Sequence, residues 1–248
     1  MVRQAVILAA GQGRRLWPHT KSTPKCLLKI GDKTILEHQI EALRSQGIDR
    51  IVVVTGYLGL KVREVLAKQA ECVENKEFEE TSSMYSLWLA REEIRGAFIV
   101  LNSDVLFHAG ILKLLLACPH PDALAVDPSS VLQEEEMKVQ LKGNRVVGLS
   151  KTFERADAEN VGMLKFSTQG GRVLFQRIEE LLRQNMRKVM VPYALNEIAP
   201  SYPLVAVSVE GLPWIEIDFP EDYDRARQVI HPAILKDHPT SGLSSGIL

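Results

Sequence analysis

Short apolar runs alternate with helical patterns through the first half of this 248-residue chain, and this alternation limits the folds open to it. Residues 4–10 are apolar almost throughout and are followed at once by a glycine, as expected of a strand that is buried on both faces. Further runs of this kind occur at 51–54, 97–101 and 123–126, and the helical patterns lie at 34–46, 59–68, 84–94 and 111–117. Strands that alternate with helices form βαβ units with right-handed crossovers. We therefore expect an α/β fold with a mainly parallel central sheet.

The pattern changes after Pro128, where strand patterns become more frequent. The dipeptide Gly143-Asn144 is a good hairpin turn between two short strand patterns. Beyond Pro128 we expect strands at 137–141, 146–150, 161–166 and 214–218, and helices at 172–184 and from about Pro220. The chain is thus expected to form one domain over 1–235 with a small β-rich insertion at 128–170, followed by a flexible tail at 236–248.

Composition excludes several classes of protein. The 30 Lys and Arg residues nearly balance 31 Asp and Glu, which argues against a general nucleic-acid binder. No apolar run approaches the roughly 20 residues that span a membrane. Cys26, Cys72 and Cys118 are odd in number and lack CxxC spacing, so neither a disulfide framework nor a zinc site is expected. A reducing, cytoplasmic setting is the expected location.

The charges are balanced overall but unevenly distributed. Residues 1–36 contain seven basic groups against the single acid Asp32, whereas residues 214–224 contain five acids and no base. Local blocks of opposite sign in a neutral protein suggest an anionic ligand held at one block and a cation at the other.

A glycine-rich loop with several basic residues follows the first predicted strand. Gly11 and Gly13 allow the backbone to turn sharply and to direct several N–H groups at a phosphate chain. Cationic side chains close to these glycines are suited to neutralise a triphosphate: Arg14, Arg15, Lys21 and Lys25.

Two familiar phosphate loops do not fit this segment. A P-loop that starts at Gly11 requires Gly-Lys at positions 16 and 17, where this chain has Leu16 and Trp17. A dinucleotide-binding fingerprint requires a glycine where Leu16 stands, and an acid at the end of a second strand, whereas Asp32 lies in a turn.

The sequence Leu8-Ala-Ala-Gly-x-Gly-x-Arg-Leu-x-Pro18, with Pro24-Lys25 after it, closely resembles the signature of the nucleotidyltransferases that make sugar nucleotides and CDP-alcohols. The resemblance continues at Asn102-Ser-Asp104 and at Glu216-x-Asp218, and so extends to about residue 230. It implies a Rossmann-like nucleotidyltransferase fold, a divalent metal, and an ordered attack on a nucleoside triphosphate. The β-rich insertion would then lie on the acceptor side.

The resemblance assigns metal binding to the positions of Asp104 and Asp218. Asp104 follows a predicted buried strand, and Glu216 is two residues from Asp218, so both of these side chains are expected on one face of a strand. Carboxylates of this kind suit Mg²⁺, and Glu216 is a further candidate ligand. We expect Lys25 and Arg15 to act with Asp104 and Asp218 as catalytic residues, Lys25 on the nucleotide phosphates and Arg15 on the departing pyrophosphate.

Nucleotide binding is expected from the loop, from a hydroxyl-rich segment and from the end of the third strand. The predicted residues are Leu8, Ala9, Ala10, Gly11, Gly13, Arg14, Arg15, Lys25, Thr81, Ser82, Ser83, Asn102 and Asp104. The segment at 80–87 resembles the branch that activates phosphocholine and related alcohols with CTP, and not the sugar-nucleotide branch.

The acceptor is less constrained. Lys151 matches a lysine that often contacts the acceptor phosphate in such enzymes. A quaternary ammonium group would favour aromatic faces and a carboxylate, for which Tyr85, Tyr193, Trp214 and Glu216 are available. The aromatic side chains are equally compatible with core packing. Glu159-Asn160 stands where the family pattern has Gly-Glu, which leaves the acceptor more open than the reaction.

The leading hypothesis is an Mg²⁺-dependent cytidylyltransferase that acts on CTP and a small, phosphocholine-like phosphorylated alcohol, with pyrophosphate as the second product. Alternative acceptors are inositol 1-phosphate and aminoethylphosphonate. A sugar-1-phosphate nucleotidyltransferase that uses UTP or dTTP, and a nucleotide-binding regulatory protein without turnover, are the other hypotheses. Neither nucleic acid nor a membrane is expected as a partner, and a homodimer is compatible with the sequence.

Overall fold

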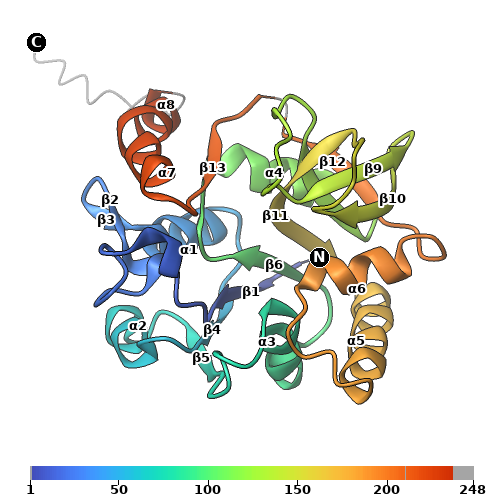
Figure 1. Ribbon diagram of the computed structural model, residues 1–248, viewed down its shortest axis with the longest axis horizontal. Coiled ribbons are helices and arrows are strands. Elements are labelled where there is room, and N and C mark those ends of the chain that lie inside the picture. The colour runs from blue at the N-terminus through green and yellow to red at the C-terminus, as the bar shows by residue number, and fades with distance from the viewer. Residues whose placement is uncertain (1, 210, 237–248) are drawn as a thin grey trace, which may run out of the picture.

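The computed structural model describes residues 2–209 and 211–236, and its centre is a nine-stranded sheet (Figure 1). The strand order is β5-β4-β1-β6-β11-β8-β12-β10-β9. These strands are β1 (Gln4–Ala9), β4 (Arg50–Thr55), β5 (Glu71–Glu74), β6 (Phe98–Asn102), β8 (Ala123–Asp127), β9 (Lys138–Lys142), β10 (Arg145–Ser150), β11 (Ala158–Phe166) and β12 (Val205–Ser208).

The sheet is mixed, so the expectation of a mainly parallel sheet is correct for one part only. Strands β5, β4, β1 and β6 are parallel, as the alternation of strands and helices predicted. Strand β11 then pairs antiparallel with both β6 and β8, and β10 pairs antiparallel with β9 and β12. A register shift in β11 between Asn160 and Leu164 interrupts its pairing with β8.

Helices cover both faces of the sheet. Helices α1 (Ile35–Ser45), α2 (Gly59–Leu66) and α4 (Ala109–Ala117) bury their apolar residues in one cluster against the sheet. Helices α3 (Ser83–Leu89), α5 (Thr168–Arg183) and α6 (Val191–Ile198) do so in a second cluster. The strands are buried on both sides, which explains their nearly continuous apolar sequence.

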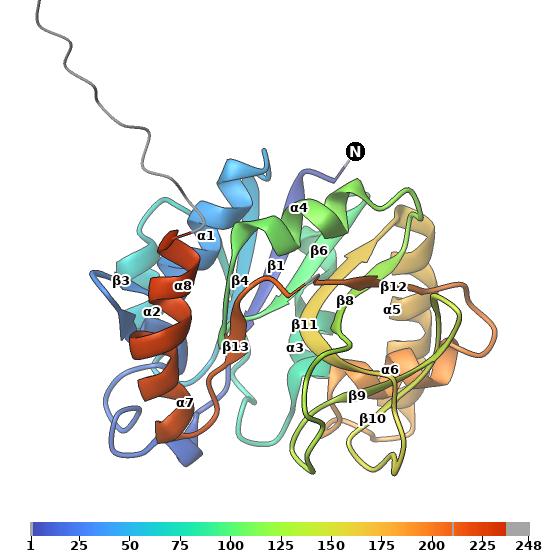
Figure 2. The ribbon, with the colours of Figure 1, turned by 90° about the horizontal axis from the view of Figure 1, so that it is seen from above.

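The C-terminal segment crosses back to the glycine-rich loop. Strand β13 (Trp214–Glu216) pairs antiparallel with β7 (Val105–Phe107). After it come helix α7 (Pro220–Arg225), a π-helical stretch (Ala226–Ile230) and helix α8 (His231–Lys236). These helices lie beside the two-stranded ribbon of β2 (Lys29–Ile30) and β3 (Lys33–Thr34) (Figures 1 and 2). A third apolar cluster joins these parts and contains Leu16, Ile30, Ile217 and Ile230. The pairing brings residues 216–218 beside the end of β6.

The predicted β-rich insertion at 128–170 is not confirmed. The β9–β10 hairpin forms with its turn at Gly143, as expected, but both strands belong to the main sheet. Strand β11 lies within the same residue range and occupies a central position between β6 and β8, because its apolar side chains contribute to the cores on both faces. The predicted tail begins at the last residue of α8, and its remaining residues lie outside the described ones.

Two short 3₁₀ turns, Arg14–Leu16 and Lys25–Leu27, lie in the segment that was expected to be a loop, and a third, Ala90–Glu93, follows α3. Strands β2, β3, β5, β7 and β12 and helix α6 are elements that the sequence patterns did not predict. Among the described residues, no helix combines the length and the apolar character needed to cross a membrane.

Gly162 has a structural role that an alanine cannot fill. Its φ is +77°, and a Cβ atom there would lie 2.9 Å from the side-chain nitrogen of Asn102. Gly143 has a similar φ of +64° with open space around it, and so is a matched control. We expect Gly143→Ala to lower the free energy of unfolding by about 1–2 kcal/mol, the cost of a left-handed backbone. Gly162→Ala should cost about 1–3 kcal/mol more, because Asn102 must move. Urea unfolding of both variants tests this, and equal losses would contradict it.

Candidate active site

A cavity of about 580 Å³ lies at the carboxyl ends of β1 and β6, where open α/β sheets bind their ligands. Its walls come from the glycine-rich loop, the segment between β5 and α3, the turn after β6, and the chain after β13. The lining includes basic side chains from the N-terminal part of the chain, among them Arg15 and Lys25, and the acidic side chains of Glu216 and Asp218 from the C-terminal part. The two charge blocks of the sequence therefore meet in space.

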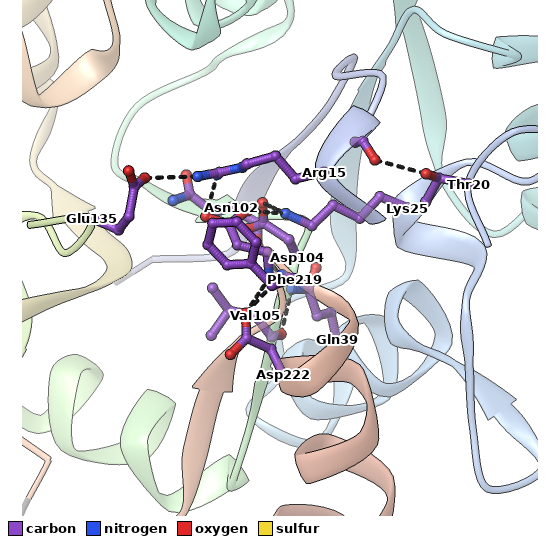
Figure 3. Close-up of polar contacts among 12 residues, drawn as sticks. Arg15, Thr20, Lys25, Gln39, Asn102, Asp104, Val105, Glu135, Phe219 and Asp222 are labelled. Atoms are coloured by element: carbon purple, nitrogen blue, oxygen red, sulfur yellow. Dashed lines mark hydrogen bonds and ion pairs between the residues drawn. The ribbon is translucent and has the colours of Figure 1, made fainter. Parts of the chain in front are cut away.

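The glycine-rich loop begins directly after β1. Gly13 has left-handed backbone angles, which precede the short 3₁₀ turn Arg14–Leu16. The hydroxyl of Thr20 donates to the carbonyl oxygen of Gly13 at 2.7 Å (Figure 3), and Leu16 is fully buried in the third apolar cluster. The bond from Thr20 and the burial of Leu16 thus hold the loop in place, and Arg14 and Arg15 line the cavity.

Lys25 lies between two carboxylates. Its Nζ donates to Asp104 Oδ2 at 2.8 Å and to Asp218 Oδ1 at 2.5 Å. Burial disfavours the charged form of Lys25, but Asp104 and Asp218 outweigh that effect and raise the pKa of Lys25 above its ordinary value. Burial likewise opposes the ionised form of Asp218, but Lys25 and Arg15 lower its pKa below the ordinary value. The ion pairs hold Lys25 and Asp218 charged at neutral pH.

Asp104, Glu216 and Asp218 together could hold a metal ion. Each offers an oxygen that lies within 4.8 Å of those of the other two. Within the described part of the chain, the Oδ1 atom of Asp104 is buried and has no hydrogen-bond partner. Burial and the charges of Asp104 and Asp218 raise the pKa of Glu216 to about 8, so without a bound cation this carboxyl group is mostly protonated at neutral pH. An unpartnered carboxylate oxygen with two further carboxyl groups close to it fits a hard divalent cation such as Mg²⁺.

Arg15 and Lys151 both line the cavity and share one carboxylate partner, Glu135. Arg15 donates to Asp218 at 2.5 Å and to Glu135 at 2.7 Å, and its guanidinium lies over the ring of Phe219 (Figure 3). Lys151 Nζ is 3.4 Å from the same Glu135 oxygen. Both cations thus already contact an anionic oxygen, in a position that a phosphate oxygen could occupy.

Small polar side chains line the end of the cavity away from the carboxylates. Asn75 is buried at the end of β5, and its amide donates to the hydroxyl oxygens of Thr81 and Ser86 at 2.9 and 3.1 Å. Gln12 donates to Glu79 at 2.7 Å and so joins the glycine-rich loop to the opposite wall. This end offers hydroxyl and amide groups at fixed positions.

All the residues predicted to be catalytic, metal-binding or nucleotide-binding line this cavity. Sequence analysis did not predict several other lining residues, among them Gln12, Asn75, Phe78, Ser86, Glu135 and Asn160. Asn75 follows β5, a parallel strand on the edge of the sheet, so its position in the cavity could have been predicted from the strand end. It was missed because the sequence analysis did not predict the short strand β5.

The predicted acceptor-binding residues divide into two groups. Lys151 and Glu216 line the cavity, whereas Tyr85, Tyr193 and Trp214 are not among the described residues that do so. Tyr85 stacks on Trp88 at a separate shallow hollow, with the guanidinium of Arg187 over its ring. The indole N–H of Trp214 donates to Asp127 at 2.8 Å, and Tyr193 is 40% exposed on α6. These three residues therefore lie outside the lining of this cavity, and their contact with an acceptor stays a prediction.

Fold and site together define a nucleotidyltransferase domain. A family model described as the MobA-like NTP transferase domain matches residues 5–137, more than half of the sequence. The chain belongs to this family. The match includes the glycine-rich loop, Lys25 and Asp104, while Glu216 and Asp218 lie beyond it.

Proteins similar to this chain include cytidylyltransferases. A bifunctional IPC transferase and DIPP synthase from Aquifex aeolicus is 30% identical over 95% of this chain, which spans 54% of that protein. A CTP:phosphoglutamine cytidylyltransferase from Campylobacter jejuni is 27% identical over 89% of this chain and 97% of its own length. The solved structure of the inositol-1-phosphate CTP transferase from T. maritima has the same fold, with a TM-score of 0.78 and 23% identity over 92% of this chain and 98% of that one.

Removing the charge of Glu135 should favour anions at the mouth of the cavity. In Glu135→Gln, Arg15 and Lys151 lose the carboxylate that an incoming anion must displace. Because exposed ion pairs contribute about 0.2–1 kcal/mol, we expect inorganic pyrophosphate to bind about two- to fivefold more tightly, as measured by calorimetry. The exposed neighbour Glu134 provides the control Glu134→Gln. Equal affinities in the two variants would show that Glu135 does not compete with anions.

Proposed function

We propose that this protein is an Mg²⁺-dependent cytidylyltransferase that transfers CMP from CTP to a small phosphorylated alcohol and releases pyrophosphate. The observation that carries the proposal is the position of Lys25 between Asp104 and Asp218, inside a cavity bordered by the glycine-rich loop. The choice of CTP is supported by the cytidylyltransferase from Campylobacter, which matches this chain over nearly its full length.

The protein's main contribution to such a reaction is alignment and charge compensation. The phosphate oxygen of the acceptor is already anionic near neutral pH, so its attack on the α-phosphorus needs no strong base. The backbone of Ala10, Gly11 and Gly13 faces the cavity and is suited to bind the triphosphate through N–H groups. Lys25 would contact the nucleotide phosphates, and Arg15 would bind the pyrophosphate as it leaves.

Asp104, Asp218 and Glu216 would hold the Mg²⁺ ion. When bound, the ion supplies positive charge that stabilises the pentacoordinate arrangement around the α-phosphorus. Lys25 already compensates two of these carboxylates, and its tight ion pairs keep their oxygens close together before any metal arrives. Since one oxygen of each of the three carboxyl groups lies within 4.8 Å of the other two, they require little rearrangement to bind a cation.

Lys151 is our candidate for the acceptor phosphate. It lines the cavity, contacts the same Glu135 oxygen as Arg15, and is about one-third exposed. We place phosphocholine first among the acceptors to be tested, followed by inositol 1-phosphate and aminoethylphosphonate. Since Tyr85, Tyr193 and Trp214 do not line the cavity, a cationic acceptor would depend on carboxylates such as Glu216.

A substrate matrix tests the proposal. Pyrophosphate release is measured with Mg²⁺ for CTP, UTP, dTTP, ATP and GTP, each against phosphocholine, inositol 1-phosphate, aminoethylphosphonate and glucose 1-phosphate. We expect turnover with CTP and one of the first three acceptors. Turnover only with UTP or dTTP and glucose 1-phosphate would assign the protein to the sugar-nucleotide branch. Binding of CTP without turnover in any combination would favour a regulatory protein or an acceptor outside this set.

The proposed metal ligands lead to a second prediction. Asp104→Asn removes one negative charge from the cluster while it preserves the shape of the side chain. Turnover of the best substrate pair should fall by about 100-fold or more, because charge stabilisation of the transferring phosphoryl group is weakened. Asp49, an exposed residue in the turn before β4, supplies the control Asp49→Asn. Nearly wild-type turnover in Asp104→Asn would show that Asp104 takes no part in the reaction.

A further inference from the structure

One buried amide holds the turn that presents Asp104. The turn comprises Ser103 and Asp104 between β6 and β7, and Gln39 reaches it from helix α1. The side-chain Nε2 of Gln39 donates to the carbonyl oxygens of Asn102 and Val105, both at 2.8 Å (Figure 3). These carbonyls lie on either side of the turn, so a single NH₂ group bridges its two ends.

The position of Gln39 itself is firmly determined. Only 1% of its surface is exposed, and it lies on the buried face of α1 beside Leu36, Ile40 and Leu43. The helix begins with a capping box in which Thr34 and Glu37 bond each other's backbone N–H groups. Gln39 is therefore a buried polar residue, held in place by its helix, on an otherwise apolar helix face.

Stabilisation of the core does not by itself explain why a glutamine is buried at position 39. Among the described residues, the Oε1 atom of Gln39 is buried and has no hydrogen-bond partner, and such an atom destabilises a fold. Among the described residues, two backbone bonds also reach the turn, each at a single site: Ser103 N donates to Leu8 O at 3.3 Å, and Ile217 N donates to Asp104 O at 3.0 Å. Neither of them connects both ends of the turn, whereas Gln39 does.

We propose that Gln39 is a positioning residue that holds Asp104 in the geometry needed for a divalent cation, an inference that rests on the proposed metal site. Asp104 Oδ2 is bonded to Lys25, while its Oδ1 is free to contact the ion. Mg²⁺ requires nearly ideal octahedral geometry with short bonds, so a small displacement of the turn weakens binding. Groups that orient metal ligands from behind typically change metal affinity by about 10- to 100-fold when they are removed.

Gln39→Met tests this inference because it keeps the size and burial of the side chain but removes the N–H donors. The readout is Mn²⁺ binding to the protein without nucleotide, followed by the electron paramagnetic resonance signal of free Mn²⁺. We expect binding about 10- to 100-fold weaker than in the wild type.

Gln4→Met is the matched control. Gln4 is 6% exposed, and its amide bonds backbone groups at Ala97 and Arg95, at the end of β1 remote from the cavity. Thermal unfolding should show a loss of stability in both methionine variants, but only Gln39→Met should weaken Mn²⁺ binding. Wild-type Mn²⁺ affinity in a folded Gln39→Met would overturn the inference, as would an equal loss in Gln4→Met.

Two further variants keep the outcomes distinct. If Gln39→Met does not fold, Gln39→Asn takes its place, because the shorter amide keeps its polarity but cannot bond both carbonyls, and the same loss of Mn²⁺ affinity is expected. Asp104→Asn tests the metal site on which the inference depends. If the wild type binds Mn²⁺ no better than Asp104→Asn, the proposed metal site is wrong and the inference is overturned with it. If the wild type does bind and Gln39 variants bind equally well, only the role of Gln39 is refuted.

Discussion

The ion pairs of Lys25 with Asp104 and Asp218 are the interaction on which the rest of the site depends. Two partly buried carboxylates, with the carboxyl group of Glu216 close by, would repel one another strongly without a cation between them. The partners are 79 and 193 residues apart in the sequence, so the pairs also join the two ends of the domain. The same contacts thus reduce a local repulsion and connect the N-terminal loop to the C-terminal segment.

The topology of the sheet makes this meeting possible. Strands β1 and β6 are adjacent and parallel, which places the loop after β1 next to the turn after β6. The C-terminal segment reaches the same edge because β13 pairs with β7, directly after that turn. Parallel strands gather their carboxyl ends at one edge, and the basic and acidic blocks of the sequence are both attached to it.

The features that the sequence predicted correctly are local ones. The parallel strands, the glycine-rich loop and the cavity-facing residues around Lys25 and Asp104 follow from short apolar runs and from what stands at their ends. The antiparallel insertion of β11 between β6 and β8 depends on pairing between distant segments, which no local pattern encodes. Trp214 was ambiguous for a related reason, since an aromatic side chain suits a core and a ligand equally well. The bond to Asp127, a residue far away in the sequence, decides its orientation. The proposed roles of the site residues, the homodimer and the acceptor stay predictions.

Folding and chemistry use neighbouring residues in this protein. Around β13, Ile215 and Ile217 belong to the third apolar cluster, while Glu216 and Asp218 line the cavity. Leu16 is buried in the same cluster, and Arg15 before it faces the carboxylates. In the extended backbone around β13 side chains point alternately to opposite sides, so burial of Ile215 and Ile217 fixes the direction of Glu216 and Asp218. In the 3₁₀ turn Arg14–Leu16 successive side chains point about 120° apart, so burial of Leu16 directs Arg15 away from the cluster. The free energy of packing this cluster therefore also helps to set the geometry of Asp218 and Arg15, and the buried Gln39 bonds both ends of the turn that carries the remaining carboxylate, Asp104.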